Sequence, residues 1–330
     1  MNTNIVRTAV ACFALALTSQ GRSAELAVPK DGWASWQVDA VENAPAWCCF
    51  DWDNGKDSAP ATCKLDGDNH GFGSRDEAKT SAVRIYAKFA GGKIQRIRSL
   101  AAACPVETKS PIQKLENVST DDSARWLTAL AKTAPMGKHE MGEDVLAAIG
   151  IHRGDVAFNA LRDTARNEAD AEQRKRAIFW LAELRGEPGA EIVSSSMFSD
   201  KDPDVRKHAG FSMTLSKSPR VGAELIKQGN TDKDGDVRAQ AWFWLAHTGA
   251  PNAEVPIIAA ANKDADDHVR EQAIFALSQL PDERAVPALI KAAEDKSLSR
   301  EQRKRALFWL GQSESPAAAA YIDKVLMGSR

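Results

Sequence analysis

The chain has 330 residues, of which 43% are hydrophobic and 27% are charged, and its formal net charge is −2. This length and composition allow a large core and exclude a disordered or collagen-like protein. The charge balance lacks the basic surplus that nucleic-acid binding favours, so we expect no nucleic-acid partner.

Residues 1–24 have the layout of a secretory signal peptide. A short polar start with one arginine, Arg7, precedes an apolar stretch over residues 8–18, which is too short to span a bilayer comfortably. Cleavage after Gly21 and cleavage after Ala24 both stay open. We expect an exported protein, periplasmic or extracellular, with no membrane insertion after the signal peptide is removed.

Residues 26–118 predict a small β-rich module. Within it, residues 81–101 predict a β-hairpin, because apolar and polar side chains alternate from Val83 to Phe89 and Gly91-Gly92 supplies a tight turn. The return strand alternates less cleanly, which allows for a bulge. The rest of the module is expected to be rich in loops. It contains the aromatic residues Trp33, Trp36, Trp47, Phe50 and Trp52.

Four cysteines remain once the signal peptide is removed, and all lie in this module: Cys48, Cys49, Cys63 and Cys104. An even number of cysteines in an exported chain predicts two disulfides, with three possible pairings. A bond between the adjacent Cys48 and Cys49 would be strained and is the least favoured. A zinc site is the alternative, but the spacing has no C-x-x-C pair.

The stretch DGDNHGFGSRDE (66–77) resembles a calcium-binding loop in the placement of its acidic residues and of Gly71. The candidate ligands are Asp66, Asp68, His70 and Glu77. His70 stands where Asp or Asn is usual, and no flanking helices are predicted. The segment therefore predicts at most a weak Ca²⁺ site, against the alternative of an ordinary glycine-rich loop, and no other cofactor is predicted.

Beyond residue 120 the sequence repeats. The decamers EQRKRAIFWL (172–181) and EQRKRALFWL (301–310) differ at one position. An alanine marks five units at intervals of 32, 32, 32 and 33 residues: Ala177, Ala209, Ala241, Ala273 and Ala306. An arginine lies three residues before each alanine: Arg174, Arg206, Arg238, Arg270 and Arg303. A phenylalanine lies two residues after each: Phe179, Phe211, Phe243, Phe275 and Phe308. Agreement of this kind is the signature of a repeat architecture.

Each unit predicts two helices. The first begins after an acidic turn such as Asp202-Pro-Asp204, where a carboxylate can cap free N–H groups. The second is shorter, as in residues 285–295, with Pro287 in its first turn. One pair cannot bury its apolar face alone, so we predict stacked pairs in an α-solenoid over residues 120–330. Residues 169–327 hold the clear repeats, and residues 120–168 predict a degenerate cap.

The segment DADDHVREQAIFALSQLPDERAVPALIKAAED (264–295) resembles a HEAT repeat of the short kind found in phycobilin lyases. The resemblance extends over roughly residues 120–327 through its V-R-x-x-A and V-P-x-L-I columns. The whole chain also resembles exported bacterial HEAT-repeat proteins with a small cysteine-containing front domain, on AWCCFDW (46–52), CKLDG (63–67) and CPVE (104–107). This resemblance implies an interaction role with a protein partner.

The arginine column predicts pairing with the aspartate of the neighbouring turn, in a ladder of ion pairs that are individually of modest strength when exposed. The basic runs 174–176 and 303–305 predict solvated faces, since they lie at opposite ends of the array. Trp180, Trp244 and Trp309 predict packing between stacked pairs, and Trp242 is expected toward the edge of its helix.

The phenylalanine column is the candidate partner-binding site. At about 100 degrees per residue, each phenylalanine falls about 240 degrees from the first apolar position of its helix, on the outer side. Five such residues predict an apolar ridge for a partner. In the alternative, each ring packs against the preceding unit under lysine and arginine stems.

Catalytic motifs are missing from the sequence. G-x-S-x-G, H-E-x-x-H and phosphate-binding loops do not occur, and His139-Glu140 is a single pair where HEAT-type iron hydroxylases need several. We expect a non-enzymatic protein-binding scaffold. The alternatives are an enzyme of the lyase kind with a bound cofactor and a calcium-responsive module.

Overall fold

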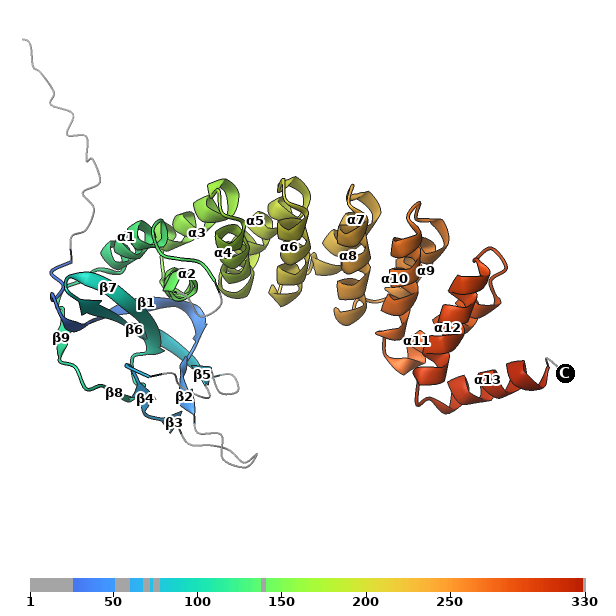
Figure 1. Cartoon of the computed structure of the whole chain (residues 1–330), viewed down its shortest axis with the longest axis horizontal. Coiled ribbons are helices and arrows are strands. Elements are labelled where there is room, and N and C mark those ends of the chain that lie inside the picture. The colour runs from blue at the N-terminus through green and yellow to red at the C-terminus, as the bar shows by residue number, and fades with distance from the viewer. Residues whose placement is uncertain (1–25, 51–59, 68–71, 74–77, 138–140, 329–330) are drawn as a thin grey trace, which may run out of the picture.

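The computed structural model describes residues 26–50, 60–67, 72–73, 78–137 and 141–328, which form a β module followed by a stack of helices (Figure 1). The predicted α-solenoid with a small β-rich, disulfide-bonded N-terminal module is confirmed. No described helix is both long enough and apolar enough to cross a bilayer.

The β module is built around a four-stranded sheet of order β7-β6-β1-β9. Its strands are β1 (Gly32–Pro45), β6 (Lys79–Ala90), β7 (Lys93–Ala101) and β9 (Ile112–Lys114). Strand β6 is antiparallel to both neighbours, and β9 runs parallel to β1. The short strands are β2 (Cys48–Phe50), β3 (Pro60–Ala61), β4 (Cys63–Lys64), β5 (Phe72–Gly73) and β8 (Val106–Glu107). Strand β2 pairs with β3 and β5, and β4 pairs with β8.

The predicted hairpin is confirmed as β6 and β7. Gly91 and Gly92 form its turn with φ angles of 58° and 75°, a left-handed conformation that glycine adopts without a steric penalty. The register shifts by one residue at Gln95 on the return strand, which is the expected bulge.

Strand β1 replaces what the sequence indicated as loop. The side chains of Trp33 and Trp36 are 0% and 1% exposed, and they lie on opposite faces of the strand. Trp33 packs in a small core with the cysteines, whereas Trp36 packs in the main core. From Trp33 to Trp36 both faces of the strand are buried, so the apolar–polar alternation by which strands are recognised is lost there, whereas Gln37 and Asp39 are exposed on either side of the buried Val38.

Two disulfides hold the far end of this module. Cys48 is bonded to Cys104 and Cys49 to Cys63, so each of the adjacent cysteines has a different distant partner. The two bridges lie side by side, with the Sγ atoms of Cys63 and Cys104 3.6 Å apart. They tie β2 and β4 to the segment after β7, where the small core alone would give little stability.

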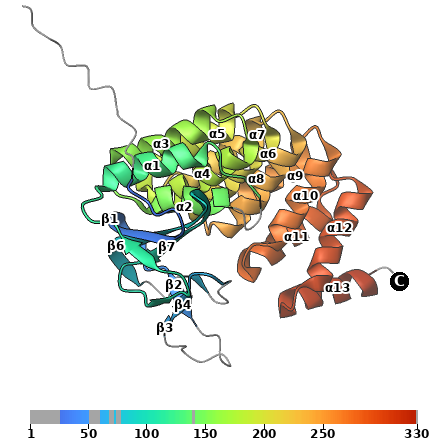
Figure 2. The same cartoon turned by 60° about the vertical axis from the view of Figure 1, so that its left-hand side comes forward.

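The solenoid begins with three helices that precede the clear repeats: α1 (Thr120–Ala131), α2 (Met141–Ile151) and α3 (Asp155–Asn167). Five pairs follow: α4 (Ala171–Leu184) and α5 (Gly186–Ser199), α6 (Pro203–Leu215) and α7 (Val221–Thr231), α8 (Gly235–His247) and α9 (Glu254–Lys263), α10 (Asp267–Ser278) and α11 (Asp282–Glu294), α12 (Arg300–Gln312) and α13 (Pro316–Met327). Figures 1 and 2 show the pairs side by side along a curved array.

The acidic turns cap the first helices as predicted. Carboxylates of Asp202, Asp234 and Asp266 accept from backbone N–H groups of α6, α8 and α10. The prediction for Pro287 was wrong, because α11 starts at Asp282 and places this proline beyond the first turn. Residues 281–285 form that turn, since the carbonyl of Pro281 accepts from the N–H groups of Arg284 and Ala285.

The sheet and the helices share one continuous core. Helix α2 packs on β7 and β1, so the sheet covers the helices expected as a cap. A buried polar chain crosses the junction: Trp36 Nε1 donates to Ser123 Oγ at 2.7 Å, and Ser123 Oγ lies 2.7 Å from His152 Nε2. The other ring nitrogen of His152 lies 2.6 Å from the carbonyl of Ala148. An indole N–H at one end and a carbonyl at the other favour a neutral imidazole in between.

The arginine column forms a ladder of buried ion pairs. Three pairs share one spacing of 26 residues: Arg174–Asp200, Arg206–Asp232 and Arg238–Asp264. These pairs confirm the predicted Arg–Asp ladder, and they are buried, since the side chains of Arg206 and Asp232 are only 3% and 4% exposed. Each arginine also donates to a carbonyl six residues earlier. The position 26 residues after Arg270 is Lys296, and Arg270 pairs with Asp267 of its own helix instead.

Trp242 lies in the core rather than at the edge of its helix, with 1% of its surface exposed. A Cβ atom added at Gly229 on α7 would lie 2.5 Å from two carbons of the Trp242 ring. The expectation of an edge position was therefore wrong, because the missing side chain at Gly229 makes room for the indole.

We expect Gly229→Ala to lower the free energy of unfolding by roughly 1–3 kcal/mol, because the added methyl overpacks the core against Trp242. Gly311→Ala on α12 is the matched control, since a Cβ there meets no atom within 4 Å. The control should raise stability by up to about 1 kcal/mol through helix propensity. Urea unfolding of both variants measures the difference, and equal stabilities would contradict the packing described here.

Burial lowers the pKa of His152 to about 4, whereas an unfolded histidine titrates near 6.5. The unfolded chain therefore takes up the proton first, and the unfolding free energy should fall by about 3 kcal/mol as the pH drops from about 6.5 to 4. His152→Gln should reduce this loss in urea titrations at several pH values. Part of the loss should persist because burial also lowers the pKa of His208 to about 4. An unchanged slope in His152→Gln would contradict the assignment.

Candidate partner-binding site

The phenylalanine column and its tryptophan neighbours form a continuous row of aromatic rings across α6, α8, α10 and α12. We call this row the aromatic stripe; its members are Phe211, Trp244, Phe243, Phe275, Trp309 and Phe308. In this order the successive ring centroids lie 4.9, 5.0, 5.8, 5.0 and 5.0 Å apart. Offset and edge contacts at such distances stabilise aromatic pairs beyond simple burial. The four helices lie next to one another in Figure 1.

The tryptophans occupy alternate layers and fill the spaces between helices, as predicted. Trp244 on α8 contacts Phe211 on α6, and Trp309 on α12 contacts Phe275 on α10. Ser212 and Ala276 stand at the equivalent places in the intervening layers. The indole N–H groups of Trp244 and Trp309 have no acceptor within the described residues, so packing alone holds these rings.

The phenylalanine rings are neither fully buried nor free of their neighbours. Phe211, Phe243 and Phe275 are half-buried against rings of the next layer, whereas Phe308 is 55% exposed at the end of the stripe. Phe179 on α4 is also half-buried and belongs to a second group, with Trp180 at 4.8 Å. Trp180 in turn contacts Trp47 of the β module at 5.4 Å, which links this group to the junction.

Charged pairs accompany these helices. Lys207 pairs with Asp204 on the first turn of α6, and Lys304 pairs with Glu301 on that of α12. Arg305 reaches across to Glu271 on α10 at 3.0 Å. The combination of an aromatic centre and a polar surround is typical of protein interfaces.

The basic runs do not form a cationic track. In the run 174–176, Arg174 is buried in the ladder, Lys175 pairs with Glu172, and Arg176 pairs with Glu143. Each charge in this run therefore has a partner within the chain.

His208 and His247 lie beside the stripe. The ring of His208 is 5.9 Å from Phe211, and the ring of His247 is 4.4 Å from Phe243. Burial lowers the pKa of His208 to about 4, so this ring is neutral at neutral pH. The six Phe and Trp residues of the stripe carry no charge, so the stripe presents an apolar surface.

Asp66 is fully engaged in contacts within the β module. Its Oδ1 accepts from Trp33 Nε1 at 3.1 Å and from Lys88 Nζ at 2.6 Å, and its Oδ2 accepts from Thr108 and from the N–H of Lys109. The Lys88 contact is the largest of several that hold the pKa of Asp66 well below its usual range. These contacts explain Asp66 without a metal ion.

The other candidate calcium ligands, Asp68, His70 and Glu77, lie outside the described residues, as does the His139-Glu140 pair. Within the described part, three or more potential ligand atoms come within 4.8 Å of one another at Cys48, Cys63 and Cys104, whose sulfurs are in disulfides. The calcium site therefore stays a prediction.

We expect Asp66→Asn to lower the free energy of unfolding by roughly 2–4 kcal/mol, because the amide replaces a charged acceptor of four donors. Unfolding with the disulfides intact measures this, with the exposed Asp39→Asn as the control. Millimolar Ca²⁺ should leave the free energy of unfolding of the wild-type protein unchanged. A Ca²⁺-dependent gain that Asp66→Asn abolishes would instead support the calcium loop.

A family model for HEAT repeats matches residues 158–246 and 222–307. No curated protein matches the sequence. Among solved structures, human deoxyhypusine hydroxylase in complex with glycerol is 16% identical, with a TM-score of 0.33 over 61% of this chain and 88% of that one. A designed armadillo repeat protein is 15% identical, with a TM-score of 0.27 over 62% of this chain and 92% of that one. The helical layers between residues 158 and 307 are HEAT repeats.

Proposed function

We propose that this protein is an exported, non-enzymatic scaffold that binds a polypeptide partner along the aromatic stripe. The observation that carries the proposal is the unbroken contact of six partly exposed rings across four successive layers. Aromatic side chains dominate the energetics of protein interfaces because they bury large areas at a small entropic cost.

The dimensions of the stripe suit an extended segment of a partner. Packed helices lie about 8–10 Å apart, so four helices present a row roughly 25–30 Å long. An extended chain of about eight residues, at ~3.3 Å per residue, spans that length. The charged pairs on the first turns of α6 and α12 supply a polar surround that favours one register of the partner over others.

Two features support export. The four cysteines that follow the predicted signal peptide are all in disulfides, which persist in oxidising compartments. The β module also relies on these bonds, since its second core contains few large residues besides the cysteines. The periplasm or the extracellular space is therefore the compartment in which we place the protein.

We expect Phe308→Ser and Phe243→Ser to weaken partner binding about tenfold or more, the effect of truncating an interface anchor. Val255→Ser is the matched control, because Val255 is also an exposed apolar residue, at 61%, but lies on α9. Affinity capture from the exported fraction identifies the partner, and calorimetry with the purified partner measures the loss.

Because Phe308 is 55% exposed, its substitution should leave the unfolding free energy nearly unchanged and so separates binding from folding. Equal affinities for the wild type and both stripe variants would overturn the proposal. Visible absorbance from a bound chromophore in the purified protein would overturn it in favour of a lyase-type enzyme.

A further inference from the structure

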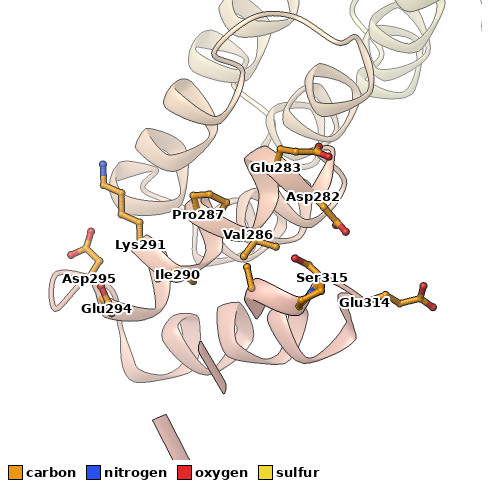
Figure 3. A pocket seen from close by; sticks show the side chains of 12 residues that line it. Asp282, Glu283, Val286, Pro287, Ile290, Lys291, Glu294, Asp295, Glu314 and Ser315 are labelled. Atoms are coloured by element: carbon orange, nitrogen blue, oxygen red, sulfur yellow. The ribbon is translucent and has the colours of Figure 1, made fainter. Parts of the chain in front are cut away.

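A second surface lies at the far end of the solenoid, between α11 and the start of α13. Here a groove of about 1030 Å³ is open to solvent (Figure 3). Its apolar lining comes from Val286, Pro287, Ile290 and Ala317. The groove is separate from the aromatic stripe, since it contains none of the stripe's residues.

The groove is strongly acidic at both ends. Five carboxylates line it against a single lysine: Asp282, Glu283, Glu294, Asp295 and Glu314, with Lys291. In Figure 3, Asp282, Glu283 and Glu314 lie toward one end, and Glu294 and Asp295 lie with Lys291 toward the other. Within the described part of the chain these carboxylates form no ion pair with a cation, and Asp295 accepts from Asn262 Nδ2 and from the N–H and Oγ of Ser297.

The acidic residues at the C-terminal end of α11 oppose the stability of that helix. The last turn of a helix carries partial negative charge, so Glu294 and Asp295 stand where cationic side chains are favoured. Lys291 offsets only part of this charge. A cationic ligand at this end would therefore interact favourably with both carboxylates and the helix terminus.

Helix α13 contributes an apolar face that the described residues leave open. Ala318 is its one buried residue, whereas Leu326 and Met327 are 65% and 71% exposed. Tyr321 and Ile322 are half-buried. The groove itself combines carboxylates with the apolar side chains of Val286 and Ile290, which favours a ligand that is both cationic and apolar.

We propose that this groove binds a lysine- or arginine-rich amphipathic segment of a partner polypeptide. The apolar side chains of that segment would pack on Ile290, and its cationic side chains would pair with the carboxylates of the groove. Charge complementarity favours such a segment over an acidic one. A second copy of this chain is a poorer fit, because the cations of both its basic runs are already engaged within their own chain, Arg303 with the carbonyl of Leu298 and the others in ion pairs. The proposal is independent of the partner on the aromatic stripe.

The test uses the full disulfide-bonded chain and a fluorescent amphipathic peptide of leucine and lysine, about 14 residues long, which suffices to span α11. A leucine–glutamate peptide with the same apolar face is the probe control. Fluorescence anisotropy at low and moderate salt should show binding of the lysine peptide alone, weakened by salt.

The double variant Glu283→Lys, Glu294→Lys should weaken binding about tenfold or more, and Ile290→Asn should weaken it as well. Glu191→Lys reverses an exposed charge on α5, away from the groove, and should bind as the wild type does. Circular dichroism confirms that each variant is folded. Phe308→Ser should also leave peptide binding unchanged, which keeps this result separate from the test of the stripe.

Equal binding of the two peptides, or unchanged affinity in the charge-reversal variant, would overturn the proposal. Sedimentation gives a further check. Self-association that Ile290→Asn abolishes would also overturn it, because the groove would then be an interface between copies of this chain.

Discussion

A pair of helices cannot bury its apolar face alone, and this constraint governs the architecture of the solenoid. Each layer covers the next, and the buried ion pairs fix their relative position. Arg206 shows how: its guanidinium bonds Asp232 bidentately and also donates to the carbonyl of Asp200, so two successive turns meet at one side chain. Such a pair needs accurate geometry to offset its desolvation, and it therefore favours one stacking arrangement over others.

The β module is part of the same structure rather than an appendage. Its sheet covers α2 and continues the core, and the polar chain from Trp36 to His152 satisfies the buried groups at the junction. The disulfides act at the opposite edge, where the core is small. The array is thus closed by the sheet at one end, while α13 at the other end keeps an exposed apolar face.

The two candidate surfaces follow from these features. The aromatic stripe exists because each layer from α6 to α12 places a ring where it meets a ring of the next layer. The acidic groove lies beyond the last rung of the ladder, where Lys296 replaces the expected aspartate. Different residues, with different chemistry, form the two surfaces, so one chain can hold two kinds of segment.

The sequence by itself determined the repeat period, the helix pairs, the aspartate caps, the hairpin with its bulge and the presence of two disulfides. These features depend on residues close together along the chain or on columns that recur at a fixed interval. Tertiary structure decided the rest. Strand β1 is buried on both faces from Trp33 to Trp36, where the alternation is lost, and the disulfide pairing depends on which strands meet. The exposure of Phe243 likewise depends on Trp244 and on Phe275 of the next layer, since a helical wheel gives a direction but not the neighbour that lies there.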